Sequence, residues 1–233
     1  MSADFSGYLQ IFAIIAIPII LAITLHEAAH GWVAWRCGDD TAYRLGRVTF
    51  NPLRHIDPMG TIILPAILVF TTGFMFGYAK PVPVNFRRLR SPRRDMVLVA
   101  AAGPATNLIL AVASGICLRL VPETGTTTGA VLTEMFKYSI YFNVILALFN
   151  MIPLPPLDGG RVAVGLLPYP LSLYLARLER YGMVILLVVL IGLPLIGQQI
   201  GVDLGIFGWI LRPLADHIEG LILWITGNNA GGL

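Results

Sequence analysis

The chain has 233 residues and a net charge of +3, and its composition is much more apolar than that of a water-soluble protein. Hydrophobic residues make up 56% of it and charged residues only 12%, compared with roughly 25% charged residues in typical globular domains. The mean hydropathy is +0.77. So few polar side chains cannot cover a water-facing surface, which excludes a soluble globular protein and predicts an all-α polytopic membrane protein, with residues 1–233 as one integral domain.

The positive charges lie in short stretches between apolar segments, where Lys and Arg set membrane topology. We therefore expect contact with the lipid bilayer and no binding of nucleic acid. The two cysteines, Cys37 and Cys117, are far apart, so they provide neither a C-x-x-C ligand pair nor a disulfide framework.

Apolar stretches long enough to span a bilayer, at about 20 residues each, recur along the chain. There are five of them, at roughly 9–35, 95–120, 131–152, 181–200 and 205–226. A sixth stretch at 60–78 is shorter, so the sequence predicts about five to six transmembrane helices.

The sixth stretch is interrupted by Pro65 and Gly73 and has basic residues on both sides. These are Arg36, Arg44, Arg47 and Arg54 before it, and Lys80, Arg87, Arg88, Arg90, Arg93 and Arg94 after it. The positive-inside rule places both flanks in the cytoplasm, whereas a full crossing would put one basic cluster outside. We therefore predict a re-entrant or membrane-surface element at 60–78; the alternative is an ordinary short span.

Two short segments, 48–50 and 80–85, have the character of strands. In the second, Pro81 and Pro83 alternate with Val82 and Val84, so one edge would lack donors while the other keeps both valine amides. This pattern predicts a short membrane-associated β element. The alternative is a polyproline loop that merely joins two segments.

The last apolar stretch carries Arg212, Asp216 and Glu219 at a spacing that places them on one helical face. Such a helix lies at the membrane interface or packs its polar face inward. The alternative is that this face gates a water-accessible cavity.

The first apolar stretch contains His26-Glu27-Ala28-Ala29-His30, an H-E-x-x-H motif. On a helix the two histidines stand one turn apart on one face, where they can bind one zinc ion with Glu27 beside it as general base. Each charged group near the membrane centre costs about 2.5–3.5 kcal/mol on insertion scales, so such residues persist mainly where they have partners. The alternative is a histidine pair that packs helices.

A catalytic zinc ion usually has three protein ligands and a water molecule. Candidates for the third ligand are His55 and Asp57 in the basic first loop, His217 in the last stretch, and Asp158. Asp158 is favoured because it follows an apolar helix that ends at prolines 153, 155 and 156, and because Gly159 and Gly160 permit a close backbone approach. A plain helix end followed by a turn is the alternative for this segment.

The sequence resembles the site-2 protease family of intramembrane zinc metalloproteases, in its compact bacterial branch. The resemblance covers residues 10–165 and rests on H-E-x-x-H, on Asn150-x-x-Pro with Leu157-Asp158-Gly159, on Gly103-Pro104-x-x-Asn107, and on the loop motifs Arg44–Arg47, Asn51-Pro52, His55–Asp57 and Ala79–Asn85. It implies that His26, His30 and Asp158 bind one Zn²⁺ per chain, that Glu27 is the catalytic base, and that Asn150 helps to hold substrate. Helices within 180–226 would be peripheral. PDZ and CBS domains of some relatives are lacking, so a regulatory protein would be separate.

The predicted topology agrees with this ligand set. If 60–78 re-enters, the helix at 95–120 crosses outward and the helix at 131–152 crosses back, so Asp158 returns to the side of His30. A full span at 60–78 would bring Asp158 to the opposite side.

We therefore expect an intramembrane zinc metalloendopeptidase that hydrolyses transmembrane protein substrates, in regulated intramembrane proteolysis or membrane protein clearance. The extended substrate would add to the edge of 80–85 at Val82 and Val84. We expect it in the bacterial inner membrane, with the active site toward the cytoplasm. The alternatives are a non-proteolytic membrane binding protein that retains the fold, and an ion-coupled transporter.

Overall fold

The computed structural model describes residues 5–72, 77–122 and 126–228, which are helical with no β-strand among them. The α-helices are α1 (Phe5–Arg36), α2 (Thr41–Arg44), α3 (Leu64–Thr72), α4 (Pro92–Leu120), α5 (Thr127–Asn150), α6 (Asp158–Leu166), α7 (Leu171–Leu187), α8 (Leu193–Ile200) and α9 (Ile206–Ile225). Short 3₁₀ turns lie at Pro52–Arg54 and Phe86–Arg88, and π-helical turns at Pro58–Ile63 and Val188–Gly192. The predicted all-α class is confirmed.

Four helical segments of the described chain are long and apolar enough to cross a membrane. They are Ile14–Arg36 in α1, all of α4, all of α5, and the continuous run Leu171–Ile200 through α7 and α8. The prediction of five to six spans is therefore not reproduced. The predicted stretch 205–226 does form α9, but its three charged residues Arg212, Asp216 and Glu219 keep it out of this set.

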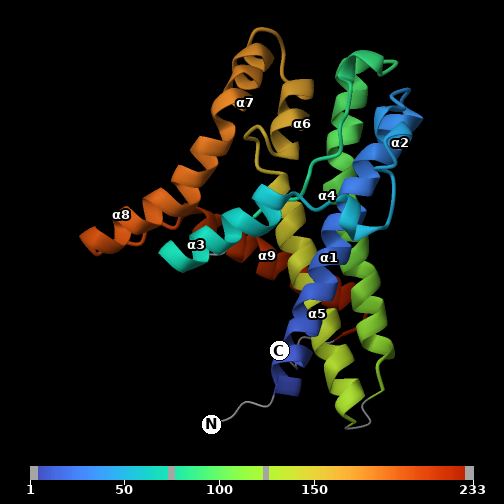
Figure 1. The fold of residues 1–233 in the computed structure, drawn as a ribbon, viewed down its shortest axis with the longest axis vertical. Helices are drawn as coiled ribbons and strands as arrows, with labels where there is room; N and C mark the ends of the chain where they lie inside the picture. The colour runs from blue at the N-terminus through green and yellow to red at the C-terminus, as the bar shows by residue number, and fades with distance from the viewer. Residues whose placement is uncertain (1–4, 73–76, 123–125, 229–233) are drawn as a thin grey trace.

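Helices α1, α4 and α5 form the central bundle, and each contacts the other two (Figure 1). Helix α9 crosses behind this bundle and packs on α4 and α5. The buried cluster between them consists of Ala111 from α4, Ile140 and Val144 from α5, and Ala215, Ile222 and Leu223 from α9. Helix α7 contacts α6 instead, and α8 extends outward beyond it.

The chain turns sharply between α5 and α6, at the proline-rich break recognised in the sequence. Helix α5 ends at Asn150, three residues before Pro153, and proline cannot continue a helix. Helix α6 begins with Asp158. A Cβ atom on Gly159 would lie 2.2 Å from the Met151 carbonyl oxygen, and one on Gly160 would lie 2.2 Å from the Pro155 nitrogen. The two glycines thus allow a close approach of the chain to its own backbone, which holds Asp158 under the end of α5.

The segment 60–78 returns to the point where it begins. The Tyr78 amide donates to the Gly60 carbonyl at 3.0 Å, and the Thr61 hydroxyl donates to the Tyr78 carbonyl at 3.0 Å. The apolar helix that begins this segment runs over Pro58–Thr71 and includes α3, which gives about 21 Å of rise against a hydrocarbon core of about 30 Å. Both ends therefore lie on one side, as a re-entrant element requires; Gly73 lies outside the described residues.

The predicted β element does not form a strand in the part of the chain that the structure describes. Residues 48–50 are a bend, and residues 80–85 are irregular chain without a ladder partner. The reason lies in the second segment itself: Pro81 and Pro83 have no amide hydrogen, and the Val82 amide donates to a side chain rather than to a neighbouring strand.

Candidate metal centre

Three side chains from two distant parts of the chain meet inside the bundle. His26 and His30 lie one turn apart on α1, and Asp158 opens α6. All three residues are buried, with 7%, 8% and 7% of their surface exposed. They form the group among the described residues whose ligand atoms lie close enough to hold one metal ion.

The three atoms that converge are all hydrogen-bond acceptors. His26 Nε2 lies 3.1 Å from His30 Nε2 and 3.2 Å from Asp158 Oδ2, and His30 Nε2 lies 3.3 Å from the same oxygen. Asp158 Oδ2 is buried and has no hydrogen-bond donor within the described structure. Tetrahedral zinc with bonds of about 2.0–2.2 Å would separate its ligand atoms by about 3.3–3.6 Å. The observed 3.1–3.3 Å is close to this range.

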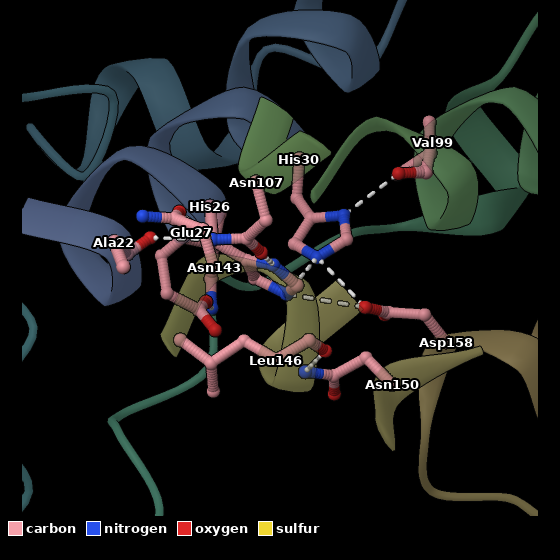
Figure 2. A network of polar contacts seen from close by, with 11 residues as sticks. Ala22, His26, Glu27, His30, Val99, Asn107, Asn143, Leu146, Asn150 and Asp158 are labelled. Carbon is pink, nitrogen blue, oxygen red and sulfur yellow. Dashed lines mark hydrogen bonds and ion pairs between the residues drawn. The ribbon is translucent and has the colours of Figure 1, made fainter. Parts of the chain in front are cut away.

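The opposite ring nitrogens decide which tautomer each histidine adopts. His30 Nδ1 lies 2.7 Å from the Val99 carbonyl oxygen, which can only accept, so Nδ1 carries the hydrogen. His26 Nδ1 lies 2.6 Å from Asn107 Oδ1 and donates to it (Figure 2). Both Nε2 atoms of the neutral rings therefore present lone pairs, and three acceptors facing one point form a group that could hold a cation.

Helix α4 closes one side of this group at Gly103. A Cβ atom there would lie 2.5 Å from His30 Nε2 and 2.6 Å from His26 Nε2. Only glycine leaves room for the two rings and an ion between them. This explains in physical terms why the motif Gly103-Pro104-x-x-Asn107 accompanies H-E-x-x-H in this sequence.

Glu27 points from α1 toward the segment 80–85 and is half-buried. Its Oε2 accepts the Val82 amide at 2.8 Å, across 55 positions of sequence. The Val82 side chain is buried at 6% exposure, while Val84 is half-buried. The edge that we expected to be open at Val82 is thus occupied by the carboxylate of the H-E-x-x-H motif.

The segment 80–85 is also bonded on both sides of this contact. The Lys80 amide donates to the His55 carbonyl at 2.9 Å, and Arg47 donates to the Lys80 carbonyl at 2.7 Å. The Asn85 amide donates to Asp39 Oδ2 at 2.6 Å. These bonds hold the segment against the end of α1 and over Glu27.

Asp39 is a residue that the sequence reasoning missed. It is completely buried, and besides Asn85 it accepts bonds from the Thr41 amide and hydroxyl at 3.1 and 2.5 Å. The sequence signal is Gly38, which directly precedes Asp39 at the end of the first apolar stretch. In the structure Gly38 has a positive φ of 112° and turns the chain there.

The other sequence candidates lie apart from the histidine pair. The His55 ring is buried against the Thr49 carbonyl, Asp57 accepts the Gly60 amide, and His217 is exposed on α9.

Asn150, the predicted substrate-binding residue, ends α5 and is half-buried. Its amide nitrogen donates to the Leu146 carbonyl at 2.9 Å, so its Oδ1 remains as an acceptor (Figure 2).

Comparison with known proteins places this arrangement in a family. The family model described as Peptidase family M50 matches residues 13–123 and 119–193. The chain belongs to peptidase family M50. This is the site-2 protease family, so the chain is a membrane metalloprotease by family and zinc is its cofactor, for which the His26–His30–Asp158 group is suited.

Curated M50 relatives agree with that assignment. A Bacillus subtilis protein named "Putative zinc metalloprotease YwhC" is 41% identical over 189 residues, which cover 78% of this chain and 82% of the relative. "Putative zinc metalloprotease Rip2" of Mycolicibacterium smegmatis is 29% identical over 79% of this chain and 69% of its own length. The Rip2 protein of Mycobacterium tuberculosis H37Rv is 28% identical over 86% of this chain and 75% of its own length. No solved structure gave a significant match.

Proposed function

We propose that this M50 protein is an intramembrane zinc endopeptidase that cleaves transmembrane protein substrates within or near their spans. The observation that carries the proposal is the depth of the two histidines on α1, which form the metal group with Asp158 of α6. His30 and His26 precede Trp35 by five and nine residues, or about 8 and 14 Å along a helix. Trp35 is exposed and stacks on Tyr43, which is typical of an aromatic belt at a membrane surface.

In this proposal His26, His30 and Asp158 hold one zinc ion. When bound, zinc supplies a water molecule with a pKa near 7 and polarises the scissile carbonyl. Glu27 would be the base that accepts a proton from the attacking water and returns it to the leaving amine. Helix α4 forms one wall of the metal group through two residues. The Val99 carbonyl orients His30, and Gly103 leaves space for the rings of His26 and His30.

Substrate would reach this centre as an extended segment beside residues 80–85. A transmembrane helix hides its peptide bonds in internal hydrogen bonds, so it must unwind before attack. We propose that a substrate carbonyl takes the Val82 amide from Glu27, which leaves the carboxylate free to act as base. Val84 would add the next bond along the same edge, and Asn150 would donate or accept at the other side of the substrate chain.

The charges at this end of the bundle support the orientation that we propose for the site. Arg36 ends α1, and Arg87, Arg88, Arg93 and Arg94 lie between the segment 80–85 and the first turn of α4. By the positive-inside rule this end is cytoplasmic. The named relatives are bacterial proteins, so we propose the bacterial inner membrane, with residues 10–165 as the catalytic core and a separate protein as regulator.

Two other functions compete with this one. A binding protein that keeps the fold would hold zinc and cleave nothing, and an ion-coupled transporter would move ions through His26, Glu27 and Asp158. The carboxylate of Glu27, half-buried beside the metal group and within reach of a neighbouring amide, favours hydrolysis.

The test is to map cleavage sites. The full chain is reconstituted in liposomes with model single-span proteins, and the products are identified by mass spectrometry. We expect cuts within or beside the span that disappear when zinc is chelated. Cuts confined to water-exposed loops far from the span would contradict intramembrane cleavage, and a zinc-loaded protein that cuts no substrate in a panel of spans would support the binding function.

A further inference from the structure

A line of buried polar groups runs from α5 through α4 to His26. Asn143 on α5 and Asn107 on α4 are 1% and 0% exposed, between otherwise apolar helix faces. Asn107 Nδ2 donates to Asn143 Oδ1 at 2.8 Å and to the Ala22 carbonyl at 3.3 Å. Asn143 Nδ2 donates to the Ser139 carbonyl at 2.8 Å. Figure 2 shows Ala22, Asn107, Asn143 and His26 in this arrangement.

The direction of every bond in this line is fixed by two backbone carbonyls. The Ser139 carbonyl can only accept, so the amide nitrogen of Asn143 must face it and the oxygen of Asn143 must face Asn107. The nitrogen of Asn107 then faces the oxygen of Asn143. The Ala22 carbonyl, which can only accept, lies on the same side and also requires the nitrogen of Asn107 there. The oxygen of Asn107 is left to face His26 Nδ1 at 2.6 Å.

The same order determines which nitrogen of His26 is free. An oxygen at 2.6 Å requires the hydrogen on Nδ1, which leaves the lone pair of Nε2 aimed at Asp158 and His30. If Asn107 were turned over, its amide nitrogen would face Nδ1 and favour the hydrogen on Nε2, where a metal ligand must have none. His30 needs no such support, because a backbone carbonyl orients it directly.

We propose that Asn143 is a positioning residue for the zinc site: it orients Asn107, and through Asn107 it keeps His26 in the tautomer that binds metal. The inference rests on the zinc site of the proposed function. The proposal gives α5 a role in metal affinity, although Asn143 bonds to Asn107 and to the Ser139 carbonyl and not to a zinc-binding side chain. Buried polar residues between membrane helices also hold helices together, so the test must separate orientation from packing.

The test measures zinc affinity of the purified full chain by competition with a chelator, together with the visible spectrum of the Co²⁺-substituted protein. Asn143→Leu keeps the side-chain size and removes the acceptor, and we expect it to weaken zinc about tenfold, as loss of outer partners of a metal-bound histidine does. Ser114→Ala is the matched control, because it removes the Ser114–Ser139 hydroxyl bond and leaves the Ser139 carbonyl in place.

A double-mutant cycle separates the two roles. If Asn143 acts through Asn107, then Asn143→Leu adds no further loss of zinc affinity to Asn107→Leu, whereas a packing role would give additive losses. Unchanged affinity in Asn143→Leu, or additivity in the double variant, overturns the proposal. If Asn143→Leu does not fold, Asn143→Ala takes its place in the same cycle. A wild type that binds zinc but cleaves nothing would remove the proposed function and leave this inference intact.

Discussion

The backbone amide of Val82 donates to Glu27 Oε2 at 2.8 Å. The carboxylate of the H-E-x-x-H motif is therefore bonded to the segment that we propose as the docking edge for substrate. A substrate carbonyl that bonds to Val82 must displace Glu27, so docking and release of the base are one exchange of hydrogen bonds. This relationship connects the loop 80–85 to chemistry on α1.

Val82→Pro removes this amide hydrogen in a segment where two neighbours are already proline. We expect cleavage of a single-span substrate to fall by about tenfold or more, because a docking bond of about 1–3 kcal/mol is lost, while zinc content stays the same. Val84→Pro should act in the same direction. Val82→Ala keeps the amide and serves as control; equal cleavage rates for Val82→Pro and Val82→Ala would refute a role for the amide.

Asp39→Asn tests whether the attachment of the segment to the end of α1 matters. Asp39 accepts three bonds and donates none, so an amide nitrogen in place of one oxygen leaves a buried donor without a partner, at about 1–3 kcal/mol. We expect cleavage to fall roughly fivefold or more with zinc content unchanged. The neighbour Asp40 pairs with Arg44 and Arg88 at the surface, and Asp40→Asn should be nearly neutral. If both variants cleave equally, the attachment is not needed.

Gly103→Ala adds a methyl group where the two rings meet. Overpacking costs about 1–3 kcal/mol, so we expect zinc affinity to weaken by roughly 5- to 150-fold. Alanine favours helix over glycine, so a loss of helix propensity in α4 would not be the cause. Gly220→Ala on α9 meets nothing within 4 Å and is the matched control. Titration of each variant with zinc in the presence of a competing chelator gives the comparison, and wild-type affinity in Gly103→Ala would show that the site lies elsewhere.

The sequence predicted the parts of the site that depend on local spacing. The i, i+4 histidines, the proline break before Asp158 and the basic flanks of 60–78 are each readable from neighbouring residues. The structure brings together the three side chains that the resemblance named. Their roles as ligands stay predictions until zinc is measured.

The parts that were missed depend on contacts between distant segments. The β element was predicted from the alternation of Pro and Val, but the Val82 amide has a side-chain acceptor 55 residues away, and no alternation rule contains that partner. Asn143 belongs to none of the motifs that the sequence shows, and its partner Asn107 is 36 positions earlier. The length of the stretch 205–226 predicts a span, whereas its three charged residues place α9 outside the four spans.

The most direct test of the central claim compares wild type with Glu27→Gln for zinc content and for cleavage of a single-span substrate. The exchange keeps the shape of the side chain and removes the base, while the groups proposed to hold zinc are unchanged. We predict one zinc ion per chain in both proteins, and cleavage in the wild type alone, with the variant slowed by at least about 10²-fold. Equal cleavage by the two proteins would contradict the account. So would a purified wild type that binds no zinc even after zinc is added back.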